Sequence, residues 1–306
     1  MSNDNPLFLV RKLLPTSGLI RRTLMCSLLA LLPLSFATAQ SSVWVATSGD
    51  EKVYLGGTVH LLRPADYPLP DPFEVAYQDS DKLFFETDIS GMNDFSVQAR
   101  MMQELTYSDA TTLSSVLNAE AYAALSTHVA TVGLPLQMME RFKPGLLIST
   151  LQVIEFQKMG FTPQGVDAYF NTRAMGDGKP VGQLESIDTQ IGFIANMGVG
   201  HESEFVLLSI ADLKEIPATM DQMVSAWRAG DNATLADLFV DDMKEGYPAL
   251  YKEILVDRNN NWMPLIENMF SEEGTEFVLV GAAHLVGDDG LLSLLEKKGY
   301  EIARVQ

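Results

Sequence analysis

The fold of this chain is decided by two matching stretches that lie near its two ends. The first is Val53-Tyr54-Leu55-Gly56-Gly57-Thr58-Val59-His60, and the second is Phe277-Val278-Leu279-Val280-Gly281-Ala282-Ala283-His284. Each is a short apolar run, typical of a buried strand, that ends near a glycine and is followed by a histidine three residues after that glycine. Open α/β sheets bind ligands at the carboxyl ends of their strands. The two histidines can therefore converge on one metal ion or one substrate.

The remaining strands are predicted from apolar runs bounded by turn residues. Ser42 to Tyr54 is typical of a hairpin around Ser48-Gly49-Asp50, and further strands are expected at Asp81–Glu86, Lys179–Leu184, Glu276–Val280 and Tyr300–Val305. Apolar residues at helical spacing fill most of the chain from about Asp94 to Trp262. The sequence thus predicts an α/β fold whose central sheet, mixed or mostly parallel, comes from both chain ends, with a large helical insertion between them.

The first 39 residues are typical of a secretory signal peptide. Basic residues precede an apolar stretch from Leu24 to Phe36, and Ala37-Thr38-Ala39 resembles a cleavage site. Cys26, the one cysteine of the chain, lies inside the apolar stretch, so we expect no lipid anchor. We expect cleavage near Ala39, a single domain over residues 40–306, and a periplasmic or secreted location.

The charge of the chain is strongly acidic. The 306 residues carry a formal charge of −19, and removal of the leader would leave 17 basic against 39 acidic residues, a net charge of −22. Such a surface repels nucleic acid and anionic lipid. We expect no nucleic-acid partner and no stable membrane anchor, and the sequence does not indicate an oligomeric state.

Four predicted strands end on a residue suited to metal binding or acid–base chemistry, namely His60, Glu86, Glu185 and His284. Imidazole and carboxylate ligands together suit zinc, manganese, cobalt or iron. Two histidines and one carboxylate with an open position can activate a water molecule. The structural alternative is that these are hydrogen-bonded groups at strand ends.

Two polar residues, Arg258 and Asn259, stand in the run Asp257-Arg258-Asn259-Asn260-Asn261-Trp262, and they could stabilise an oxyanion or be part of a solvated helix face. The other two histidines give different predictions. We expect His128 to be a structural histidine of an amphipathic helix and His201 to mark the start of a helix.

Taken in order, these segments resemble the TraB/GumN (TraB/PrgY/GumN) family over nearly the whole chain after the leader. The resemblance rests on both Gly-x-x-His motifs, on Phe84-Phe85-Glu86-Thr87-Asp88, on Gly165-Val166-Asp167 through Leu184-Glu185-Ser186, and on Asp257-Arg258-Asn259. The family is related to the Tiki metalloproteases, which are membrane-tethered and use two Gly-x-x-His motifs and a glutamate with a divalent metal. It is also grouped with erythromycin esterase-like and haem-binding ChaN-like proteins.

The resemblance implies a site in which His60, Glu86 and His284 hold a divalent ion (manganese, cobalt or zinc), with Arg258 and Asn259 beside it and Glu185 in a less defined role. The leading hypothesis is a metal-dependent hydrolase, a peptidase that acts on a peptide or small molecule. The alternative is a non-catalytic binding protein for a peptide, a signal or haem.

Overall fold

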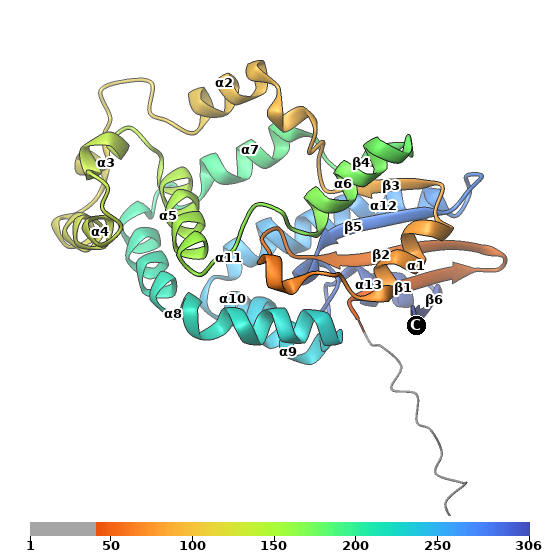
Figure 1. Ribbon diagram of the computed structural model, residues 1–306. Coiled ribbons are helices and arrows are strands. Elements are labelled where there is room, and N and C mark those ends of the chain that lie inside the picture. The colour runs from red at the N-terminus through yellow and green to blue at the C-terminus, as the bar shows by residue number, and fades with distance from the viewer. Residues whose placement is uncertain (1–40) are drawn as a thin grey trace, which may run out of the picture. The chain divides into compact units, whose positions relative to one another are not determined.

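The computed structural model describes residues 41–306, and Figure 1 shows their arrangement. The predicted signal peptide, residues 1–39, lies outside the described residues, so the leader and its cleavage near Ala39 stay predictions. The described residues belong to one compact unit. Within residues 41–306, no helix combines the length and the apolar character that a membrane span needs.

A six-stranded mixed sheet, with strand order β4-β3-β5-β2-β1-β6, forms the centre of the fold. The strands are β1 Val43–Ser48, β2 Glu51–Thr58, β3 Lys82–Phe85, β4 Val181–Gln183, β5 Glu276–Gly281 and β6 Glu301–Arg304. The three pairings β2–β5, β5–β3 and β3–β4 are parallel, and β1 is antiparallel to β2 and β6. The predicted α/β class and the strands from both chain ends are confirmed.

Strand β5 is central because its sequence suits burial on both faces. The side chains of Glu276 to Val280 are all buried, as expected for a parallel strand covered on both sides. Phe277 packs against Phe73 of α1 (Asp71–Asp79) and Phe170 of α6 (Val166–Asp177), with ring centroids 6.4 and 5.8 Å apart. Figure 1 shows α1 in front of the sheet and α12 (Arg258–Met269) behind it.

The helical insertion fills the chain between β3 and β5, and the short strand β4 interrupts it. Its longest helix, α8 (Glu202–Ala229), packs against α4 (Ala119–Thr131) and α5 (Pro144–Lys158), and a second apolar core lies among these three helices. The other helices are α2 Phe95–Glu104, α3 Leu113–Val116, α7 Ile187–Asn196, α9 Asn232–Ala236, α10 Asp242–Gly246, α11 Pro248–Tyr251 and α13 Leu291–Lys297.

Short turns of other helix types connect these elements. Four are 3₁₀ turns: η1 Pro64–Asp66, η2 Gly91–Asn93, η3 Leu136–Met139 and η6 Ala282–His284. Two are π-helical turns, η4 Asp237–Asp241 and η5 Lys252–Asp257, and η5 leads directly into α12. Single π turns are often found at functional sites because the extra residue redirects the side chains around it.

Candidate functional site

The two Gly-x-x-His motifs leave the sheet side by side. Strands β2 and β5 are parallel neighbours in which Gly57 pairs with Val280 and Thr58 pairs with Gly281. The carboxyl ends of parallel neighbours lie at the same edge of a sheet, where open α/β folds place ligands. The strand pairing therefore brings together two histidines that are 224 positions apart in the numbering.

The space above Gly281 is where the predicted residues meet. A Cβ atom at this glycine would lie 3.2 Å from Oε1 of Glu86, 3.7 Å from Cδ2 of His284 and 3.9 Å from Nε2 of His60. The backbone N–H of Gly281 donates a 2.8 Å hydrogen bond to Oε1 of Glu86. The absence of a side chain at Gly281 thus leaves room for a ligand among one carboxylate and two imidazoles.

His284 is buried and held in one orientation. Its Nδ1 donates to Oδ1 of Asn259 at 2.8 Å. This direction follows because the amide nitrogen of Asn259 already donates to the carbonyls of His284 and Asp289, which leaves its oxygen as the acceptor. The Nε2 atom accepts a hydrogen bond from Nη1 of Arg258 at 3.0 Å. Burial lowers the pKa of His284 to about 3, so the ring is neutral at physiological pH.

His60 has a different environment. Its side chain is 65% exposed, and its Nδ1 is hydrogen bonded to Oδ2 of Asp167 at 2.9 Å. The Asp167 carboxylate raises the pKa of His60 to about 9. Thr58 donates to the second Asp167 oxygen at 2.8 Å, which fixes the carboxylate.

A close backbone approach places Asp167 beside His60. A Cβ atom at Gly165 would lie 2.2 Å from the carbonyl carbon of His60, so this position requires glycine. Val166 N then donates to the carbonyl of Val59 at 3.0 Å. Asp167 was not among the predicted site residues, because it does not follow a strand; its signal was its place within one of the segments that carry the family resemblance.

Arg258 joins the remaining predicted residues. Its Nη2 donates to Glu86 at 2.5 Å and to Glu185 at 2.7 Å, and its Nε donates to Glu185 at 3.2 Å. Its Nη1 donates to His284 at 3.0 Å and to the carbonyl of Ile254 at 3.4 Å. All five guanidinium N–H groups therefore have partners. Burial would lower the pKa of Arg258, but the two carboxylates raise it, so Arg258 stays charged.

Glu86 is ionised despite its burial. Burial alone would raise its pKa, but His284, Arg258, His60 and the Gly281 N–H together lower the pKa to about 2. Because His284 is itself neutral at physiological pH, we assign most of this effect to the Arg258 charge.

Two further residues hold the site and were not predicted to belong to it. Trp262 donates from Nε1 to Oε2 of Glu185 at 3.1 Å, and its ring centroid lies 4.5 Å from that of His284. Gln190 donates from Nε2 to Oε2 of Glu86 at 3.3 Å. The signal for Trp262 was its i+4 spacing from Arg258 on α12, since such residues share a helix face.

Arg258 and Asn259 both lie on the buried face of α12. They are 7% and 1% exposed, so the alternative of a solvated helix face does not describe them. Because the donors of both side chains are already in use, either could stabilise an oxyanion only by giving up a present hydrogen bond. In the present arrangement they orient His284 and compensate the charge of the two glutamates.

A cavity of about 390 Å³ opens from this cluster. Its polar end is formed by His60, Glu86, Arg258 and His284, and its remaining lining is largely apolar. Pockets of this size and composition, with a few convergent polar groups, are typical of small-molecule and substrate sites.

The donor chemistry at this polar end fits a divalent transition-metal ion. Asp167 and Asn259 engage the Nδ1 atoms of His60 and His284, and metal-binding histidines generally have such a partner on the nitrogen that does not bind the metal. Glu86 adds a carboxylate oxygen. Within residues 41–306, however, no three His, Cys, Asp or Glu side chains are drawn together as a preformed metal cluster.

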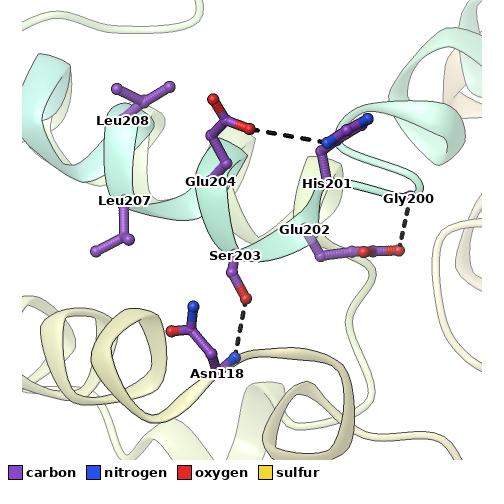
Figure 2. Close-up of a pocket in the computed structure, with 8 residues that line it drawn as sticks. All are labelled: Asn118, Gly200, His201, Glu202, Ser203, Glu204, Leu207 and Leu208. Carbon is purple, nitrogen blue, oxygen red and sulfur yellow. Dashed lines mark hydrogen bonds and ion pairs between the residues drawn. The ribbon is translucent and has the colours of Figure 1, made fainter.

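The other two histidines lie apart from this cluster. His128 is buried on α4, with Nε2 3.4 Å from Oε1 of Glu155, as expected for a structural histidine. His201 is the N-cap residue of α8, which confirms the predicted helix start. Figure 2 shows it in a separate hollow, with Glu204 beside its ring and the Glu202 side chain turned toward Gly200.

Comparisons with known proteins agree with the resemblance found in the sequence. The model of the TraB/PrgY/gumN family matches residues 42–304. A protein described as metalloprotease TIKI1, from Danio rerio, is 22% identical over 312 aligned residues, which cover 83% of this chain. The chain spans 61% of the length of that relative. No solved structure matches the chain.

Proposed function

The chain belongs to the TraB/PrgY/gumN family, and on that premise we propose that it is a metal-dependent hydrolase of peptides that acts outside the cytoplasm. The observation that carries the proposal is the convergence of Glu86 and both motif histidines on the space above Gly281. The similarity to a protein named as a metalloprotease supports the choice of reaction. The location rests on the predicted leader over residues 1–39.

A divalent ion (manganese, cobalt or zinc) held by His60, Glu86 and His284 would polarise the scissile carbonyl and make water a nucleophile at neutral pH. The protein would contribute orientation and charge. Asp167 and Asn259 fix the two imidazole rings through their Nδ1 atoms, which directs each Nε2 to the ligand. Metal binding would require His60 to lose its proton and Arg258 to release Nε2 of His284. Arg258 keeps Glu86 ionised in a buried position, which makes its oxygens available as acceptors.

The proton of the attacking water must be taken up by a carboxylate. Arg258 donates to both glutamates, but Oε1 of Glu86 borders the space above Gly281. Both oxygens of Glu185 are occupied by Arg258 and Trp262. We therefore assign the role of proton acceptor to Glu86. Glu185 has the role of positioning Arg258. Among the Arg258 contacts, the 3.4 Å hydrogen bond to Ile254 is the longest, so its N–H is the donor most readily transferred to a developing oxyanion.

The test is metal content and metal-dependent cleavage of peptides by the purified protein. The expected result is stoichiometric manganese, cobalt or zinc, a melting temperature raised by that metal, and cleavage of a peptide library. His60→Ala and His284→Ala should lose all three while remaining folded. His201→Ala, which changes an exposed histidine outside the site, is the matched control and should behave as the wild type. Full peptidase activity in either site variant would rule the proposal out.

One observation favours a second function, that of a binding protein without turnover. Arg258 already donates to Nε2 of His284, the atom that metal binding needs. If this contact persists in solution, the cavity binds a peptide, a signal or haem and does not hydrolyse it. A visible absorption band on haem addition, or peptide binding with no cleavage in the presence of any of the three metals, would favour this function.

A further inference from the structure

The cavity has two unlike ends, and the proposed chemistry uses only one of them. The apolar end is contributed by the helical insertion and by the two π turns, namely by Phe156, Met220, Met223, Phe239, Met243 and Ile254. Met220 and Met223 are buried, at 7% and 6% exposure. These side chains lie on α5, α8, η4, α10 and η5, so five elements of the insertion meet at one wall.

Among the described residues, this wall carries no ionisable side chain. Among the described residues that line the cavity, the ionisable side chains are His60, Glu86, Arg258 and His284, all at the polar end. A charged group placed against the methionines would lose its hydration without gaining a partner. Methionine is unbranched and polarizable, so a wall with three methionines can adapt to apolar groups of different shape.

We propose that this wall is a specificity subsite for one large apolar side chain, such as leucine, methionine or phenylalanine, of a bound peptide. The inference deepens the proposed function and rests on it, since the polar end would hold the scissile bond next to this side chain. A volume of about 390 Å³ is near the lower end of the ~300–1,000 Å³ usual for ligand pockets. This volume is large enough for one side chain with its adjoining peptide bond.

The placement of the wall on η4 and η5 supports a role in recognition. Phe239 lies in the first π turn, and Ile254 lies in the second, four residues before Arg258. Ile254 also accepts a hydrogen bond from Arg258 through its carbonyl. The apolar wall and the polar end are therefore joined through one helical turn, and a side chain seated on the wall is adjacent to the reacting groups.

The test is a set of fluorescent peptides that differ at one position, measured for both binding and cleavage. Binding is measured by anisotropy with a chelator present, so that affinity is read without turnover. Peptides with Leu, Met or Phe should bind ~10- to 100-fold more tightly than those with Asp, Lys or Gly. Cleavage after metal addition should follow the same preference.

Three variants connect the preference to the wall. Met223→Ala should reduce the preference for large side chains about tenfold. Met243→Glu, at a partly exposed position, should shift the preference toward peptides with Lys or Arg. This variant keeps the test decisive if Met223→Ala is unstable. Met269→Ala removes a buried methionine of α12 that does not line the cavity, and it should leave the preference unchanged.

The outcomes separate the subsite from the reaction. Cleavage without any side-chain preference would leave the hydrolase standing and overturn the subsite. Selective binding of apolar peptides without cleavage in any metal would retain the subsite and overturn the hydrolase. Equal binding of all peptides, or binding of a fluorescent fatty acid in place of the peptides, would overturn the subsite whether or not the protein is an enzyme.

Discussion

The Nη1 atom of Arg258 lies 3.0 Å from Nε2 of His284, so a permanent cation contacts the histidine that the second Gly-x-x-His motif brings to the site. The same guanidinium bonds to Glu86 and Glu185. Three groups from three separate strand ends are thus fixed to one side chain of α12. This geometry makes Arg258 the group on which the charge balance of the site depends.

We expect Arg258→Gln to destabilise the fold by about 3–5 kcal/mol, because it would leave two buried carboxylates without their cation. The measurement is urea unfolding at neutral pH. Arg173→Gln is the matched control, since Arg173 pairs with Glu74 at a more exposed position and should cost about 1 kcal/mol or less. Equal losses in the two variants would show that Arg258 does not hold the charge balance of the site.

Most of the fold could be predicted from the sequence because its strands are short apolar runs with clear turn signals. All six strands lie where the patterns placed them, and the helical insertion follows the 3.6-residue period. The strand order could not be predicted. The pairing of β2 with β5 joins segments far apart in the sequence, and no local pattern records which parallel strands are neighbours.

The sequence indicated which candidate residues lie together where this depends on strand ends, and it did not where this depends on tertiary packing. His60, Glu86, Glu185 and His284 each follow a strand, and the structure gathers them at one edge of the sheet. Asp167 lies in the first turn of α6 and reaches His60 only because Gly165 allows a close backbone approach. That contact depends on the packing of α6, which a single sequence does not reveal.

Gly281→Ala should block the site without unfolding the protein. Its φ of −48° is accessible to alanine, so the backbone needs no rearrangement. The new Cβ would lie 3.2 Å from Oε1 of Glu86, within the space where the histidines and the carboxylate meet. We expect a loss of about 100-fold in metal affinity and in peptide cleavage, of the size that small misplacements in active sites produce.

The measurements for Gly281→Ala are metal titration by calorimetry and unfolding in urea. Gly192→Ala in α7 is the control, because a Cβ at Gly192 would meet no atom within 4 Å and alanine favours a helix. Unchanged metal affinity in Gly281→Ala would show that the space above this glycine does not hold the ion.

Asp167→Asn should change the dependence of stability on pH on the alkaline side, measured with a chelator present. The pKa of His60 is raised to about 9 in the folded protein, above its unfolded value of ~6.5. Protonated His60 therefore stabilises the fold fully below about pH 6.5, and this contribution is lost as the pH rises through about 9. Because the side chain is 65% exposed, we expect about 1 kcal/mol or less.

The measurement for Asp167→Asn is the free energy of unfolding from pH 6 to pH 10. The gap between wild type and variant should be largest at pH 6 and should narrow toward pH 10. An NMR titration of His60 should also show its pKa falling toward the ordinary value in the variant. A His60 pKa that stays near 9 in Asp167→Asn would assign the shift to another group.

Glu86→Gln should change the pH dependence of stability on the acid side, and the sign should be opposite to that expected for Asp167→Asn. The pKa of Glu86 is lowered from 4.5 to about 2, so its ionised form stabilises the fold above pH 4.5, and this contribution is lost as the pH falls toward 2. The full shift would correspond to about 3 kcal/mol at neutral pH, and because His284 is uncharged there, we expect a smaller loss. The variant should therefore be less stable than wild type at pH 7 and should approach it at pH 3, as measured by urea unfolding.

Glu276→Gln is the matched control, because Glu276 is also buried but has the reverse shift. Its Oε2 atom has no hydrogen-bond partner within residues 41–306, and burial raises the pKa of the carboxyl group. The ionised form of Glu276 therefore opposes folding. The stability that the protonated form contributes is lost as the pH rises through the raised pKa. Relative to wild type, Glu276→Gln should gain stability between pH 4 and pH 7, whereas Glu86→Gln should lose it. The same sign in both variants would mean that burial, and not the Arg258 charge, determines the ionisation of Glu86.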